Sequence, residues 1–147
     1  MTKRLQFFFI VAIAFLCGCE DINSKEEKYK EQLIGNWKLI ETSVKSDSPF
    51  VNYATLHLKD GAFQSNVSFF WNTDSAKKYE PLSGYWYVEG YVGFNQHFYP
   101  ETYYQLVFQV DTNKLSMPFS VNGDSLRWFT GDNIDFWTTS HLWRRYK

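Results

Sequence analysis

The chain has only two cysteines among its 147 residues, and they lie close together, at Cys17 and Cys19. Cysteines with one residue between them do not easily satisfy the Cα separation and Cβ direction that a disulfide requires. They also supply only half of the four ligands of a structural zinc site, and no histidine lies near them in the sequence. The stability of the fold must therefore come from its core.

The sequence also lacks an apolar run long enough to cross a membrane as a helix. Its longest run, Leu5 to Leu16, is about a dozen residues and is interrupted by Gln6, whereas a spanning helix needs roughly 20 residues. Lys3 and Arg4 precede this run and small residues follow it, which is the pattern of a secretory signal. We therefore expect residues 1–18 to be a signal peptide.

The chain carries no excess of basic charge. It has 15 Lys and Arg against 16 Asp and Glu, and two of the basic residues, Lys3 and Arg4, belong to the expected signal peptide. Nucleic-acid binding depends on basic side chains that neutralise phosphates. The sequence therefore predicts no nucleic-acid partner.

Signatures of catalysis and of metal binding are missing as well. The three histidines, His57, His97 and His141, are scattered, and no pair has the spacing of zinc ligands. The chain contains neither a G-x-S-x-G nucleophile elbow nor a glycine-rich phosphate loop. We expect a protein that is not an enzyme, with no metal and no cofactor.

What the N-terminal region does contain is the sequence Leu16-Cys17-Gly18-Cys19. It resembles the bacterial lipobox, in which an aliphatic residue and two small residues precede a cysteine. The resemblance implies cleavage after Gly18 and acyl chains such as palmitate on Cys19 and the new N-terminus, enough for stable anchoring. It implies a lipoprotein of a Gram-negative cell envelope, held in the outer membrane at its periplasmic or surface face rather than in the inner membrane. The alternative is an ordinary secretory signal with an incidental Cys19.

Residues 19–32 are expected to link the lipid to the folded domain. They are charged and hold one large aliphatic residue, Ile22. Ser24 followed by Glu27 matches a capping box, and Gly35 suits a helix stop. Two alternatives stay open for this lipidated tether: a short helix from Lys25, or a solvated spacer.

From Gly35 onward, apolar and polar residues alternate with a period of two, which is typical of half-buried strands. Turn sequences such as Asp60-Gly61 and Asn122-Gly123 separate the runs. The expected strands are at 35–45, 52–59, 62–71, 83–94, 103–110, 115–121, 125–130 and 134–146, with long loops at 72–82 and 95–102. About eight strands joined by hairpins suffice to close a small barrel. We therefore predict an all-β antiparallel meander barrel over residues 33–147, with a β-sandwich as the alternative.

Gly35-Asn36-Trp37 in the first expected strand resembles the G-x-W signature of the lipocalin superfamily. The resemblance implies that Trp37 closes the narrow end of the barrel and that an arginine of the last strand packs over its ring. The last strand offers Arg144 and Arg145 for this role. A guanidinium over an indole gains cation–π energy of roughly 1–2 kcal/mol when it is desolvated.

Aromatic residues make up 20% of the chain, and they fill a barrel or form a binding surface. Three of them, Tyr99, Tyr103 and Tyr104, lie around Pro100, in the loop expected at 95–102 and directly after it, and loops are where binding residues concentrate. Asp74-Ser75-Ala76, in the other long loop, resembles an O-glycosylation pattern of some bacterial envelope proteins, with Ser75 as the acceptor.

Together these features predict a lipid-anchored envelope protein that acts as a binding module. In the first interpretation, a small apolar ligand occupies the barrel and contacts four interior aromatic residues, which are Trp86, Tyr104, Phe108 and Trp128. In the alternative, the barrel is filled and the protein binds a protein or a glycan through an aromatic surface. A large open cavity would favour the first interpretation, and a packed interior with exposed aromatic side chains would favour the second.

Overall fold

The computed structural model describes residues 22–43, 45–68, 79–130 and 139–147. The expected signal peptide, Cys19 and Ser75 lie outside the described residues. The same is true of residues 69–71 and 134–138, which the sequence assigns to two of the strands.

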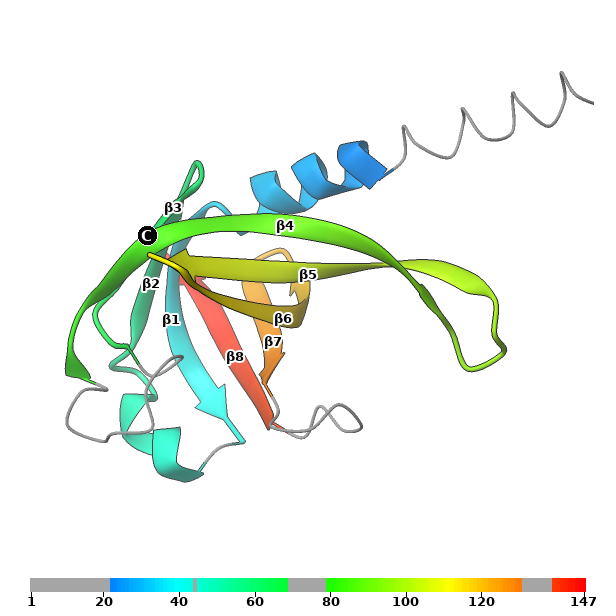
Figure 1. Ribbon diagram of the computed structural model, residues 1–147. Helices are drawn as coiled ribbons and strands as arrows, with labels where there is room; N and C mark the ends of the chain where they lie inside the picture. Colours follow the sequence, from blue (N-terminus) through cyan, green and yellow to red (C-terminus); the bar gives the residue numbers. More distant parts are fainter. Residues whose placement is uncertain (1–21, 44, 69–78, 131–138) are drawn as a thin grey trace, which may run out of the picture.

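Eight antiparallel strands follow one another around a closed barrel in chain order (Figure 1). They are β1 (Gly35–Thr42), β2 (Thr55–Lys59), β3 (Ala62–Ser65), β4 (Leu82–Phe94), β5 (Pro100–Val110), β6 (Asn113–Asn122), β7 (Ser125–Thr130) and β8 (Thr139–Tyr146), with a 3₁₀ helix, η1 (Lys45–Phe50), after β1. The first and last strands pair with each other and close the ring. The predicted all-β meander barrel is confirmed, and the sandwich alternative is wrong.

Several expected boundaries differ from the structure. Strand β1 ends at Thr42 rather than at residue 45, where η1 begins, and β3 ends at Ser65, with residues 66–68 outside the strand. Strand β2 begins at Thr55 rather than at residue 52, because residues 51–53 form a turn in which Asn52 has a φ of 64°. Strand β5 begins at Pro100 rather than at residue 103, so residues 100–102 of the loop expected at 95–102 belong to the strand. Proline is tolerated as the first residue of a strand, where its missing N–H leaves no gap in the ladder.

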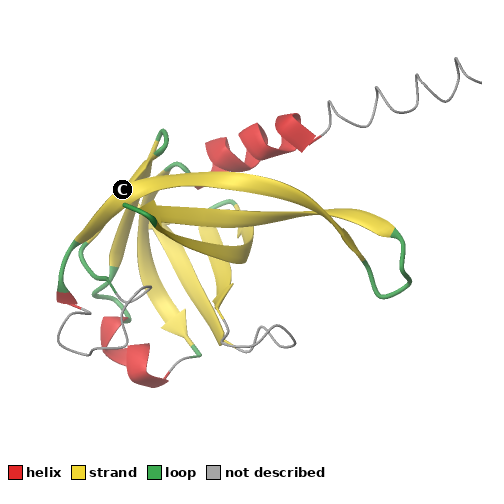
Figure 2. Ribbon diagram, viewed as in Figure 1, coloured by secondary structure: helices red, strands yellow, loops and turns green. Residues whose placement is uncertain are grey.

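Residues 22–33 form an α-helix that packs against the barrel (Figure 2). Its last residue, Leu33, is fully buried, and the ring of Tyr29 lies 5.1 Å from that of Tyr104. The ammonium of Lys30 lies 2.7 Å from the carboxylate of Asp60 in the β2–β3 turn, and the hydrogen bond to Asp60 raises the pKa of Lys30. Of the two alternatives for this segment, the structure therefore has a helix. The start expected at Lys25 is wrong, because the helix already includes Ile22 and Ser24.

The interior of the barrel is filled by large side chains. The largest are four indoles, each no more than 1% exposed: Trp37, Trp86, Trp128 and Trp143. Rings of different strands contact one another, with 4.9 Å between the centroids of Phe63 on β3 and Phe108 on β5 and 4.7 Å between those of Trp128 and Trp143 on the neighbouring strands β7 and β8. This packing replaces the disulfides that the sequence lacks.

Strands β4 and β5 are longer than their outer neighbours. On β4, only Leu82 to Tyr85 pair with β3. On β5, only Gln105 to Val110 pair with β6. Beyond these pairs, β4 and β5 continue together as a two-stranded hairpin that projects from the barrel (Figure 1).

Candidate functional site

The residues expected to close the barrel lie close together in the structure, on the paired strands β1 and β8. Trp37 lies on β1 with its ring fully buried, and its Nε1 donates a hydrogen bond of 2.8 Å to the carbonyl of Leu33. The guanidinium of Arg145 on β8 lies 4.4 Å from the centroid of the Trp37 ring. The neighbouring Arg144 has an exposed side chain. Of the two candidate arginines, Arg145 therefore occupies the position over the indole.

Gly35 makes room for this arrangement. A Cβ at Gly35 would come within 2.5 Å of Nη1 of Arg145, and the residue has a φ of 149°, which side chains rarely adopt. Nη1 of Arg145 donates to the carbonyl of Ile34 and Nη2 to that of Gln32, each at 2.6 Å. A cation at the carboxyl end of a helix also interacts favourably with the helix dipole. One arginine therefore joins the helix, β1 and β8.

The four expected ligand-binding residues lie in the packed interior. Trp86, Phe108 and Trp128 are at most 1% exposed, and Tyr104 is partly buried against the same core. Their contacts are with the protein itself: the rings of Phe108 and Trp128 lie 5.8 Å apart, and Nε1 of Trp86 donates to the carbonyl of Lys59 at 2.5 Å. The structure thus places three of them within the core cluster and Tyr104 against it.

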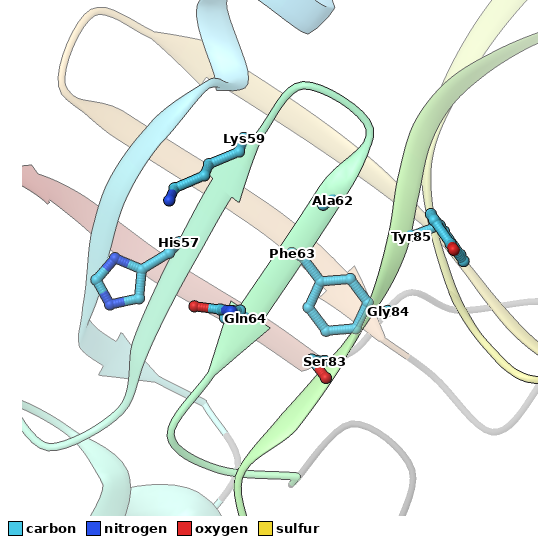
Figure 3. A pocket seen from close by; sticks show the side chains of 8 residues that line it. All are labelled: His57, Lys59, Ala62, Phe63, Gln64, Ser83, Gly84 and Tyr85. Atoms are coloured by element: carbon cyan, nitrogen blue, oxygen red, sulfur yellow. The ribbon is translucent and has the colours of Figure 1, made fainter.

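A surface hollow lies on the outer face of strands β2, β3 and β4 (Figure 3). It consists of two adjoining depressions of about 330 and 380 Å³, which share His57, Gln64 and Ser83. We call it the outer groove. Its other side chains include Thr55, Lys59, Ala62, Asn66 and Tyr85.

A row of polar side chains crosses the outer groove at right angles to the strands. The strand register pairs Asn36 with His57, His57 with Gln64, and Gln64 with Ser83. Residues paired across antiparallel strands point to the same face, so the four side chains stand side by side. Three consecutive antiparallel pairings therefore build a continuous polar row from β1 to β4.

His57 is fixed within this row by its neighbours. Its Nδ1 lies 2.7 Å from Oδ1 of Asn36, and its Nε2 lies 3.4 Å from the hydroxyl of Tyr146. A hydrogen on Nδ1 suits both contacts, because Nδ1 then donates to Asn36 and Nε2 accepts from Tyr146. The imidazole is held at the edge of the groove, next to the amide of Gln64.

The chemistry of the outer groove is that of a binding surface. Gln64 and Ser83 present amide and hydroxyl groups that both donate and accept hydrogen bonds, whereas the amide of Asn66 is hydrogen-bonded to the backbone of Thr55 and Tyr53. Tyr85 stands at the rim with 69% of its surface exposed, and Lys59 contributes the single charge among the lining side chains. Such a surface suits an uncharged ligand rich in hydroxyl groups.

Sequence reasoning did not single out this groove. Alternation indicates that His57, Gln64 and Ser83 face away from the core, but the register between strands decides which polar side chains become neighbours. The β2–β3 hairpin turn Asp60-Gly61 is the one signal that fixes the pairing of His57 with Gln64.

Two further observations concern the described part of the chain. Within it, no cluster of three or more histidine, cysteine or carboxylate side chains is placed to hold a metal ion. No helix in the same residues combines the length and the hydropathy that crossing a membrane requires.

Comparison with protein-family models, with curated proteins and with solved structures found no match.

Proposed function

We propose that this chain is a lipid-anchored protein of the bacterial cell envelope that binds a neutral glycan in the outer groove and catalyses no reaction. The lipobox at Leu16–Cys19 supports the anchor, and the filled barrel supports binding on the outside of the barrel. An apolar ligand inside the barrel would have to displace rings such as Trp86 and Trp128, which are at most 1% exposed. The proposal therefore follows the second of the two interpretations of the sequence.

The polar row beside Tyr85 is the observation that carries the proposal. Amide and hydroxyl groups of Gln64 and Ser83 match the hydroxyls of a sugar, which donate and accept in turn. An exposed tyrosine ring offers a flat apolar face and a polar tip, which is suited to the apolar face of a pyranose ring. The groove is shallow and open along the sheet, so it fits a segment of a chain better than an enclosed small molecule.

Glycan binding is tested by calorimetric titration of the lipidated protein with soluble fragments of envelope polysaccharide and of peptidoglycan. We expect saturable binding that weakens about tenfold in Tyr85→Ala and in Gln64→Ala, which corresponds to about 1.4 kcal/mol for each lost contact. Tyr99→Ala is the matched control, because Tyr99 is 68% exposed and lies on the projecting hairpin. Binding unaffected by both groove substitutions, or no binding to any fragment, contradicts the proposal.

The anchor is tested separately by mass spectrometry of the N-terminal peptide and by detergent-phase partition. We expect acyl chains on Cys19 and loss of membrane partition in Cys19→Ser. An unmodified Cys19, or a Cys19→Ser variant that partitions as the parent does, contradicts lipidation and leaves the groove proposal standing.

A further inference from the structure

The end of the projecting hairpin gathers exposed apolar side chains. Of the nine large apolar side chains that are exposed in the described residues, five lie between residues 91 and 99. They are Tyr91, Val92, Phe94, Phe98 and Tyr99, with exposures from 45% to 86%. We call residues 91–99 the hairpin tip. A cluster of this kind on a monomer marks a contact surface.

The hairpin tip is also without formal charge. No Asp, Glu, Lys or Arg occurs between Glu89 and Glu101. Its apolar side chains occupy both faces of the ribbon, since neighbouring residues such as Tyr91 and Val92 point to opposite sides. A protein groove would cover one face, whereas a lipid interface surrounds both.

The turn itself presents its aromatic ring to the surroundings. Phe98 has a φ of 60° and is 86% exposed, the highest value among the exposed apolar side chains described. Oδ1 of Asn95 accepts hydrogen bonds from the amides of His97 and Tyr99, which fixes the turn around it. A bulky residue at positive φ is uncommon and strained. The backbone is thus held in a conformation that points an aromatic side chain outward.

The start of the helix contacts the base of the same hairpin. Oε1 of Glu26 accepts a hydrogen bond of 2.6 Å from the amide of Gly90, and a Cβ at Gly90 would lie 3.0 Å from Cγ2 of Ile22. Cys19 is three residues before Ile22, so its Cα stays within about 11 Å of that of Ile22 in any conformation. The proposed lipid is therefore attached close to Gly90, the residue from which the hairpin leads to its tip. Figure 1 shows the helix start and the hairpin on the same side of the barrel.

We propose that the hairpin tip lies in the headgroup interface of the membrane that holds the acyl chains on Cys19. This inference rests on the lipid anchor of the proposed function and adds a second contact, which sets the orientation of the barrel on the membrane. Aromatic side chains with an apolar body and a polar tip are enriched at this depth. In the hairpin, the outer edges of β4 and β5 have no strand partner, because β3 and β6 pair only with the parts nearer the barrel. Unpaired backbone groups are costly in the hydrocarbon core, so the tip should stay in the headgroup region.

The test places an environment-sensitive fluorophore on Gln96→Cys in the lipidated protein, reconstituted into phosphatidylethanolamine–phosphatidylglycerol vesicles. Gln96 is exposed and lies between Phe94 and Phe98, so both rings are retained. The acylated sulfur of Cys19 does not react with the label. Thr112→Cys is the matched control, because this exposed residue follows the far end of β5, roughly 33 Å along the strand.

We expect the fluorophore at residue 96 to emit at shorter wavelength in vesicles than in detergent-free buffer and to be quenched by lipids spin-labelled near the headgroup. The fluorophore at residue 112 should show neither effect, and Phe94→Ser with Phe98→Ser should abolish both effects at residue 96. Equal emission at 96 and 112 in vesicles, with acyl chains present on Cys19, overturns the tip proposal and leaves the anchor intact.

Two other outcomes also overturn the proposal. A shift at residue 96 that occurs in native envelopes and not in pure lipid vesicles identifies a protein as the occupant of the tip. Absence of acyl chains from Cys19 removes the anchor and, with it, the membrane contact that depends on it.

Discussion

The guanidinium of Arg145 lies 4.4 Å from the centre of the Trp37 ring and donates hydrogen bonds to two carbonyls at the end of the helix over residues 22–33. Its Nε also lies 3.5 Å from the carboxylate of Asp124 in the β6–β7 turn. A single side chain of the last strand thus holds the helix, the first strand and a turn together. This relationship explains why an arginine, a tryptophan and a glycine occur together at this end of the barrel.

Replacing Arg145 with alanine should lower the free energy of unfolding by about 2–4 kcal/mol, because charge-assisted hydrogen bonds and a cation–π contact are lost together. Arg145→Lys should recover only part of the loss, since an ammonium cannot reproduce the planar fork. Urea unfolding followed by tryptophan fluorescence measures the free energy of unfolding of both variants. Arg144→Ala, at the adjacent exposed position, is the control and should change stability by less than about 0.5 kcal/mol. Equal losses at the two positions would contradict the assignment of Arg145.

Gly35→Ala should destabilise the barrel by more than about 1 kcal/mol, since the new Cβ would meet Arg145 and the backbone has a positive φ. Part of this cost is a clash with Arg145. The double variant Gly35→Ala with Arg145→Ala should therefore be less destabilised than the sum of the two single variants. A double-mutant cycle from urea unfolding measures the difference. Strict additivity would mean that the cost of alanine at this position is a backbone effect alone.

Glu26→Ala should loosen the helix from the hairpin, because the Gly90 amide loses its acceptor on the open edge of β4. Hydrogen exchange at the Gly90 amide should become faster, and the helix amides should follow. The free energy of local opening should fall by about 1–3 kcal/mol, the cost of removing one partner of a charge-assisted hydrogen bond. Glu27→Ala, at an exposed position of the same helix, should leave both exchange rates unchanged. Unaltered exchange at Gly90 in the Glu26 variant would argue against the contact.

Phe108→Ala should cost about 3–5 kcal/mol of stability, because it removes a fully buried ring that contacts Phe63 and Trp128. Thermal unfolding measures the change. The matched aromatic control is Tyr85→Ala. Because Tyr85 is 69% exposed, this substitution should lower the free energy of unfolding by less than about 0.5 kcal/mol. If Phe108→Ala is as stable as the parent protein but binds an apolar ligand differently, the barrel interior is a ligand site rather than a packed core.

The architecture could be predicted because the sequence expresses it locally. Alternation such as that of Leu56 and Leu58 identifies strands, and turns such as Asp60-Gly61 join them into hairpins. About eight strands were expected, and the described residues form eight, in the order of the chain. Two of the boundaries that differ, at Thr55 and Pro100, depend on a turn with positive φ and on an edge proline, which period-two patterning does not reveal.

The candidate site was harder to predict because it depends on relations between strands. Alternation assigns Trp86 and Phe108 to the inside of the barrel, yet the same pattern serves a cavity lined by rings and a core packed with them. Only the packing distinguishes the two. The outer groove depends on strand register, and the projecting hairpin depends on β4 and β5 being longer than β3 and β6. Neither property belongs to a single segment of the sequence.

The contact between Arg145 and the carbonyl of Ile34 joins residues 111 positions apart. During synthesis, the ribosome releases Ile34 long before Arg145, so the ring remains open until β8 has been made. Closing such long loops slows folding. The ring therefore closes only when β1 and β8, the first and last strands of the barrel order, meet each other.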